Sequence, residues 1–238
     1  MRIANHIPNT ITSMNLLSGV IGVIFAMEGR PDVAFPLMLA AAAFDFCDGL
    51  AARALHTVSG IGKELDSLAD VVSFGVLPSL MLYKTMPGES AVRFLPLFIA
   101  VMSAVRLARF NLDERQQTDF LGLPTPACAM VCGSLAYYVQ ASPDGALAAF
   151  LLRPAFLSVL SVLLGLLLVS GIPMFSMKIK KGHSLLDAKR LVFFCLCAAA
   201  VLAVVLLREN WSLAVFRAFC AYIAVNLAFV PFTVKNNE

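Results

Sequence analysis

The chain has 238 residues, of which 60% are hydrophobic and only 14% are charged. A soluble domain is ordinarily about 25% charged, so this sequence has too little polar surface to cover itself in water. The net charge of +3 is modest, and no run of Lys and Arg interleaved with aromatic residues indicates nucleic-acid binding. The composition predicts an integral membrane protein with no stretch long enough for a soluble catalytic domain.

Apolar runs separated by charged or Pro- and Gly-containing breaks predict an all-α polytopic bundle of about eight transmembrane helices. We expect residues 1–238 to form a single membrane-embedded domain. Because eight is even, both termini lie on one side, and the loops on that side carry most of the Lys and Arg residues. The positive-inside rule therefore predicts cytoplasmic termini. The expected spans lie near residues 10–27, 33–54, 66–84, 91–109, 125–141, 154–173, 190–207 and 212–232.

Four aspartates interrupt the second and third expected spans. An acidic residue at the centre of a spanning helix costs roughly 2.5–3.5 kcal/mol on insertion scales, so such residues indicate a functional site. Asp45 and Asp48 are three residues apart and share a helix face, while Asp66 and Asp70 are one turn apart on the next helix. The two pairs can therefore converge, and the segment that joins them is expected on the cytoplasmic side.

Four carboxylates without His or Cys suit Mg²⁺ or Mn²⁺ much better than Zn²⁺ or copper. Magnesium usually keeps coordination positions open for substrate phosphates. Gly49 lets a ligand approach the helix backbone, and Arg53 can pair with a phosphate, so the group predicts a diphosphate site. The simpler alternative is that the acids pair with Arg53 and Lys63, but two bases would leave carboxylates uncompensated.

From Asp45 the sequence reads D-F-C-D-G-L-A-A-R, followed after eight residues by G-K-E-L-D-S-L-A-D, which ends at Asp70. This pattern resembles the signature of the CDP-alcohol phosphotransferase family, DxxDGxxAR(x)8GxxxDxxxD, at every defining position. The resemblance implies a six-helix membrane-embedded core, here residues 5–173, and a homodimer. Two additional helices, over residues 190–232, lie outside that core.

The resemblance also implies roles for individual residues. Asp45, Asp48 and Asp66 would hold two divalent cations, Mg²⁺ or Mn²⁺, and Asp70 would complete the shell of the second cation and accept a proton. The N-terminal segment P-N-T-I-T resembles the family's Pro-Asn-x-x-Thr segment, which lines the nucleotide pocket, although Pro-Asn before a span is also a common turn and helix cap. The residues implied in binding CDP-diacylglycerol are Gly49, Arg53, Ser59, Gly62, Asn9 and Thr12.

Two further segments resemble the phosphatidylserine synthase branch of the family. The first consists of R-L-A-R-F-N from Arg106 followed by F-L-G-L-P-T-P-A from Phe120, taken together, and the second is S-F-G-V-L-P-S from Ser73. The resemblance implies transfer of a phosphatidyl group from CDP-diacylglycerol to L-serine with release of CMP. One of Arg106 and Arg109 is expected to receive the serine carboxylate and the other a phosphate. Their alternative role is to snorkel to the membrane interface and set topology.

Two other functions stay open at this point. The same scaffold could use glycerol 3-phosphate or inositol phosphate as acceptor, which would demand a further basic pocket. Lys178, Lys180 and Lys181 are the only dense supply of such charge. A divalent-cation transporter is the alternative from another class, because intramembrane Asp pairs also line ion paths. Clustering of the acids near one membrane face disfavours it.

Overall fold

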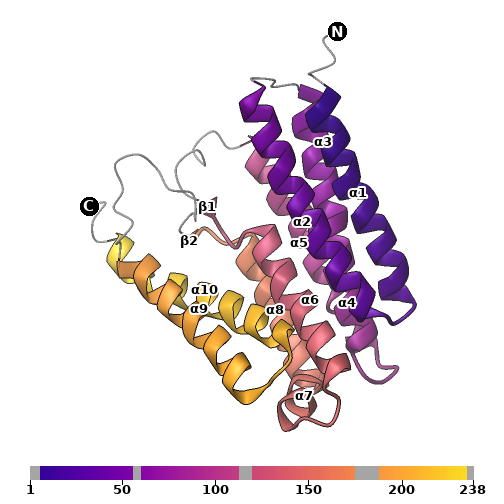
Figure 1. The fold of residues 1–238 in the computed structure, drawn as a ribbon, viewed down its shortest axis with the longest axis vertical. Coiled ribbons are helices and arrows are strands. Elements are labelled where there is room, and N and C mark those ends of the chain that lie inside the picture. The colour runs from indigo at the N-terminus through magenta and orange to yellow at the C-terminus, as the bar shows by residue number, and fades with distance from the viewer. Residues whose placement is uncertain (1–5, 56–59, 113–119, 175–187, 235–238) are drawn as a thin grey trace.

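The computed structural model describes residues 6–55, 60–112, 120–174 and 188–234, and almost all of them are helical (Figure 1). Proline occupies the first turn of α2, α6 and α8, where its missing N–H leaves no helical hydrogen bond unmade. The helices are α1 (His6–Met27), α2 (Pro31–Ala54), α3 (Gly60–Asp70), α4 (Leu77–Thr85), α5 (Leu97–Leu112), α6 (Thr125–Ala141), α7 (Ala146–Leu151), α8 (Pro154–Leu168), α9 (Ala188–Leu207) and α10 (Trp211–Val234).

The structure confirms an all-α polytopic membrane protein. Six of the described helical segments are long and apolar enough to cross a bilayer. Two more of the expected spans, α6 with 17 residues and α8 with 15 residues, are shorter. The spans that meet both criteria are His6–Met27, Pro31–Ala54, Gly60–Thr85, Ala91–Leu112, Arg190–Leu207 and Trp211–Phe229.

Two expected helix boundaries were wrong. The third span begins at Gly60 rather than near residue 66, so Asp66 lies in the second turn of α3 and Asp70 at its C-terminal end. The sixth span ends at Leu168 rather than at residue 173. Its last expected residues instead lead into β2 (Pro173–Met174), which pairs antiparallel with β1 (Phe120–Leu121). The apolar run continues past the helix, although Gly171 and Pro173 follow it closely and such residues commonly mark the end of a helix.

The third span changes its helical pitch immediately after Asp70. Residues Val71–Val76 form a π-helical turn, η2, which joins α3 to α4 without a break. Such wide turns often occur at functional sites because they rotate the following side chains relative to the preceding ones. A 3₁₀ turn, η3 (Ala91–Phe94), precedes α5 in the next span.

Helix α6 lies at the centre of the molecule, and most of its side chains are buried. On one side it packs with α1, α2 and α4 around Phe35, Met38 and Leu77. On the other side it packs with α8, α9 and α10 around Leu135, Leu164 and Tyr222. Figure 1 shows the resulting order, with α1 to α5 on one flank, α6 and α8 between, and the α9–α10 hairpin on the other.

Gly122, directly after β1, is a position where any side chain is expected to destabilise the protein. Its φ of +78° belongs to the left-handed region, and a Cβ there would lie 2.5 Å from the Leu168 carbonyl oxygen. Gly122→Ala should therefore lower the free energy of unfolding by more than about 1 kcal/mol, measured by thermal unfolding in detergent. Gly88→Ala is the matched control, because Gly88 has a φ of +85° but open space around it. Equal losses in both variants would contradict the role of the close contact.

Candidate active site

The C-terminal half of α2 presents two acids toward α3. Asp48 is buried, with 6% of its surface exposed, and Asp45 is half-buried one turn earlier. Gly49 follows Asp48, and a Cβ built there would meet no atom within 4 Å. Arg53 lies exposed near the end of the helix. The two carboxylates thus border a stretch of helix backbone that an approaching ligand can reach.

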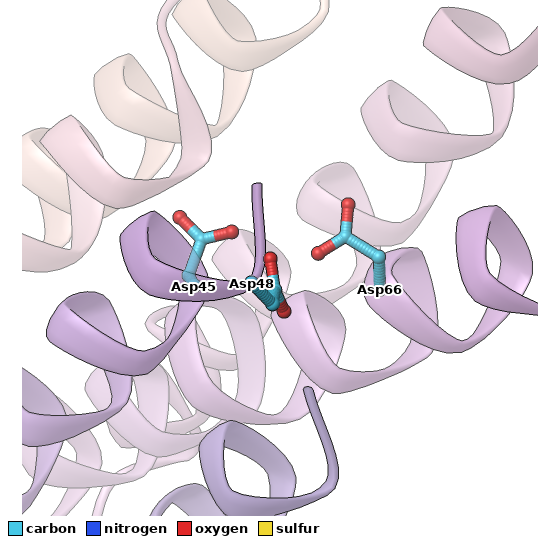
Figure 2. A group of neighbouring side chains, drawn as sticks. All are labelled: Asp45, Asp48 and Asp66. Carbon is cyan, nitrogen blue, oxygen red and sulfur yellow. The ribbon is translucent and has the colours of Figure 1, made fainter. Parts of the chain in front are cut away.

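Asp66 of α3 completes a group of three carboxylates. One oxygen from each of Asp45, Asp48 and Asp66 lies within 4.8 Å of the others. Figure 2 shows the three side chains converging from the two helices. Asp66 Oδ1 is buried and has no hydrogen-bond partner among the described residues. A buried carboxylate oxygen without a donor is costly, so the group fits a bound cation, and its all-oxygen donors suit a hard divalent ion.

Asp70 lies one turn beyond Asp66 on α3 and is buried. It is not one of the three carboxylates that meet within 4.8 Å. One face of α3 therefore carries Asp66, which belongs to the group of three carboxylates, and Asp70, which lies next to that group. The two acids can therefore have different chemical roles.

Helix α1 supplies a polar wall to the site. Thr12 Oγ1 donates a hydrogen bond of 2.6 Å to Asp48 Oδ2, and Asn15 Nδ2 donates one of 3.3 Å to Asp70 Oδ1. Thr12 was expected at the site, and Pro8 and Asn9 lie within the first turn of α1 rather than before it. Asn15 was not predicted from the sequence as a residue of the site. It could have been identified as a polar residue three positions after Thr12, on the same face of an apolar span.

Arg106 approaches the site from α5. Its side chain is buried, with 7% exposed, and Nη1 donates to Thr125 Oγ1 at 2.9 Å. Its Nε is buried without a hydrogen-bond partner among the described residues. Asp70 acts on the guanidinium electrostatically, although the two do not form a salt bridge within the described chain. A buried guanidinium with unused donors is suited to receive an anionic group.

Arg109, three residues later, lies in a different environment. It is exposed, and its Nη1 donates a long hydrogen bond of 3.4 Å to the Val169 carbonyl oxygen. The sequence did not distinguish the two arginines, whereas in the structure Arg106 is buried and Arg109 is exposed. Arg106, the buried one of the two, lies within electrostatic reach of Asp70.

The remaining residues that the sequence analysis named differ in burial and in their hydrogen bonds, and some lie outside the described ranges. Gly62 and Asn9 are half-buried, on α3 and α1 respectively. Lys63, the alternative partner for the acids, donates through Nζ to the Asn111 carbonyl oxygen at 3.0 Å. Ser59 lies outside the described residues, as do Lys178, Lys180 and Lys181.

Comparison with known proteins adds an independent finding. A family model described as CDP-alcohol phosphatidyltransferase matches residues 5–171. A Mycobacterium tuberculosis protein named CDP-diacylglycerol–serine O-phosphatidyltransferase is 33% identical over 98% of this chain and 79% of its own length. A Bacillus subtilis protein with the same name is 35% identical over 53% of this chain and 72% of its own. An archaetidylserine synthase from Methanothermobacter thermautotrophicus is 35% identical over 54% of this chain and 56% of its own.

Proposed function

The chain belongs to the CDP-alcohol phosphatidyltransferase family, and from this premise we propose that it transfers a phosphatidyl group from CDP-diacylglycerol to L-serine. The observation that carries the proposal is the convergence of three carboxylates from α2 and α3 within 4.8 Å. The names of the relatives above support serine as the acceptor. The product would be phosphatidylserine, with CMP as the leaving group.

The proposed donor site is the acid cluster and the α2 and α3 backbone around it. Asp45, Asp48 and Asp66 would hold two divalent cations, Mg²⁺ or Mn²⁺, with Asp70 completing the shell of the second. Bound cations would neutralise the diphosphate and the negative charge that develops on the departing CMP. The residues proposed to contact CDP-diacylglycerol are Gly49, Arg53, Ser59, Gly62, Asn9 and Thr12.

The proposed reaction is a single displacement at the phosphorus that carries the diacylglycerol oxygen. The serine hydroxyl oxygen forms the new bond to this phosphorus, and the bridging P–O bond to CMP breaks, so CMP leaves with the electron pair. Asp70 accepts the proton of the serine hydroxyl. This assignment requires a hydrogen bond of about 2.6–3.2 Å between them in the substrate complex. The burial of Asp70 beside the cluster supports it.

We propose Arg106 as the residue that receives the serine carboxylate. Hydrogen bonds to charged groups contribute about 1.5–3 kcal/mol, so Arg106→Gln should raise the KM for serine roughly 10- to 100-fold. The KM for CDP-diacylglycerol should change much less. Arg109→Gln is the comparison variant, with a smaller expected effect because Arg109 is exposed. An unchanged serine KM in Arg106→Gln would remove Arg106 from the acceptor site.

The protein is a multi-pass membrane protein, and its orientation is part of the proposal. We place both termini and the active site on the cytoplasmic side, on the strength of the distribution of Lys and Arg. Acyl chains could then stay in the bilayer while serine arrives from the cytosol. A homodimer is proposed from the family resemblance alone.

The test of the proposed function is CMP release by purified protein with CDP-diacylglycerol and a panel of acceptors. The panel contains serine, glycerol 3-phosphate, inositol and inositol phosphate, each with Mg²⁺ or Mn²⁺. We expect serine alone to stimulate CMP release and to yield phosphatidylserine. Release driven by a phosphorylated acceptor, with none from serine, would assign a different alcohol to the same scaffold.

A further inference from the structure

The acid proposed as proton acceptor, Asp70, lies where the third span changes pitch. It is the last residue of α3, and the π-helical turn η2 begins at Val71. The regular four-residue spacing that aligns Asp66 with Asp70 therefore stops at Asp70. Asp70 itself keeps regular helical φ and ψ, so its side chain lies over the preceding turn, on the side of Asp66. Its carboxylate can still rotate about the side-chain torsions, and a contact from a neighbouring helix can hold it in one orientation.

Helix α1 lies close enough to η2 to provide that contact. A Cβ at Gly19 would overlap Ser73 Oγ and lie 3.0 Å from Ser73 Cα, so only glycine allows this approach. Ser73 Oγ in turn donates to the Asn15 carbonyl oxygen at 3.1 Å. Asn15 lies one turn before Gly19 on α1, so the approach of the two backbones brings its side chain to Asp70.

Asn15 is an unusual residue for this position in an apolar span. Its side chain is fully buried, and its one hydrogen bond among the described residues is donated by Nδ2 to Asp70 Oδ1. Its own Oδ1 is buried without a partner. A buried polar group with half of its hydrogen-bonding capacity unused is rare where packing alone decides the residue. The amide therefore has a role that an apolar residue of the same shape could not fill.

We propose that Asn15 is a positioning residue that holds Oδ1 of Asp70, so that Oδ2 faces the acceptor hydroxyl. This inference rests on the proposed function, because it concerns the group that receives the proton. Ser73 and Gly19 act one step further away, by keeping α1 against η2. The unpartnered oxygen of Asn15 is then available to a hydrogen-bond donor that arrives with the acceptor.

The test is Asn15→Leu, which keeps the approximate shape of the side chain and removes the amide. Loss of an outer residue that orients a reacting group typically costs roughly 10- to 100-fold, and we expect kcat to fall by this factor. The KM values for CDP-diacylglycerol and for the acceptor should stay near those of the wild type. Ser18→Ala is the matched control on α1, because the Ser18 hydroxyl bonds the Leu37 carbonyl oxygen rather than Asp70.

A merely structural role for Asn15 would lower the unfolding temperature and disturb KM and kcat alike, and that result would overturn the proposal. So would a kcat in Asn15→Leu close to that of Ser18→Ala. If Asn15→Leu does not fold, Ser73→Ala tests the same point. It removes the hydroxyl that bonds Asn15 and should lower kcat with KM unchanged, and an unchanged kcat would refute the arrangement. The assay uses whichever acceptor the wild type accepts, so failure of the serine assignment would be seen separately, in the wild type.

Discussion

Asp66→Asn is expected to abolish CMP release, with a loss of at least about a thousand-fold, or roughly 4 kcal/mol of transition-state stabilisation. The substitution keeps the shape of the side chain and removes its charge. Asp66 is the only member of the three-carboxylate group that comes from α3, so no other member replaces it there. A neutral amide would bind a divalent cation more weakly, and the diphosphate would lose its counter-charge.

The same expectation applies to removal of the cation itself. EDTA should abolish turnover of the wild-type protein, and added Mg²⁺ or Mn²⁺ should restore it, whereas neither should change Asp66→Asn. Asp32→Asn is the matched control, since Asp32 lies in the first turn of α2, remote from the cluster, and pairs with Arg30 at 3.3 Å. Turnover that survives both EDTA and Asp66→Asn would refute the proposed cation site.

Asp70→Asn is expected to bind CDP-diacylglycerol and to lose transfer. Removal of a positioned general base typically costs about 10²- to 10⁴-fold in rate, and we expect kcat to fall within that range. Because Asp70 lies outside the group of three acids within 4.8 Å, donor binding should depend on it much less than on Asp66. The amide can donate to a hydroxyl or accept from it, but it cannot take up its proton.

Binding of CDP-diacylglycerol by Asp70→Asn can be measured calorimetrically in detergent, beside CMP release in the same preparation. Comparison with Asp66→Asn separates the two roles, since Asp66→Asn should lose donor binding and transfer together. Normal turnover in Asp70→Asn would contradict its role as proton acceptor. Loss of donor binding equal to that of Asp66→Asn would instead assign Asp70 to the cation site alone.

The distribution of the acids also bears on the transporter alternative. Asp45, Asp48 and Asp66 meet within 4.8 Å, Asp48 and Asp70 contact Thr12 and Asn15 in the first half of α1, and the end of α2 and the start of α3 lie beside the start of α1 (Figure 1). An ion path would need polar groups through the whole depth of the membrane. Within α8, α9 and α10 the described chain offers few, so the arrangement fits binding at one end of the bundle better than conduction.

Helix periodicity explains why the acid cluster could be predicted. Residues three or four apart lie on one helix face, so the spacing of Asp45 and Asp48, and of Asp66 and Asp70, already aligned each pair. The short connection between α2 and α3 then brought the pairs together. The strand β2 after α8 could not be predicted in the same way, because it exists only through pairing with β1, over 50 residues earlier.

The sequence by itself determined the membrane class, the spans and the acids of α2 and α3, because composition and helical spacing are local properties. Only the tertiary structure distinguished buried Arg106 from exposed Arg109, and only it joined Thr12 to Asp48 and Asn15 to Asp70. Those contacts link residues 36 and 55 positions apart. The Asn15 contact depends on how closely α1 approaches η2, where Gly19 meets Ser73, and no local pattern encodes that distance.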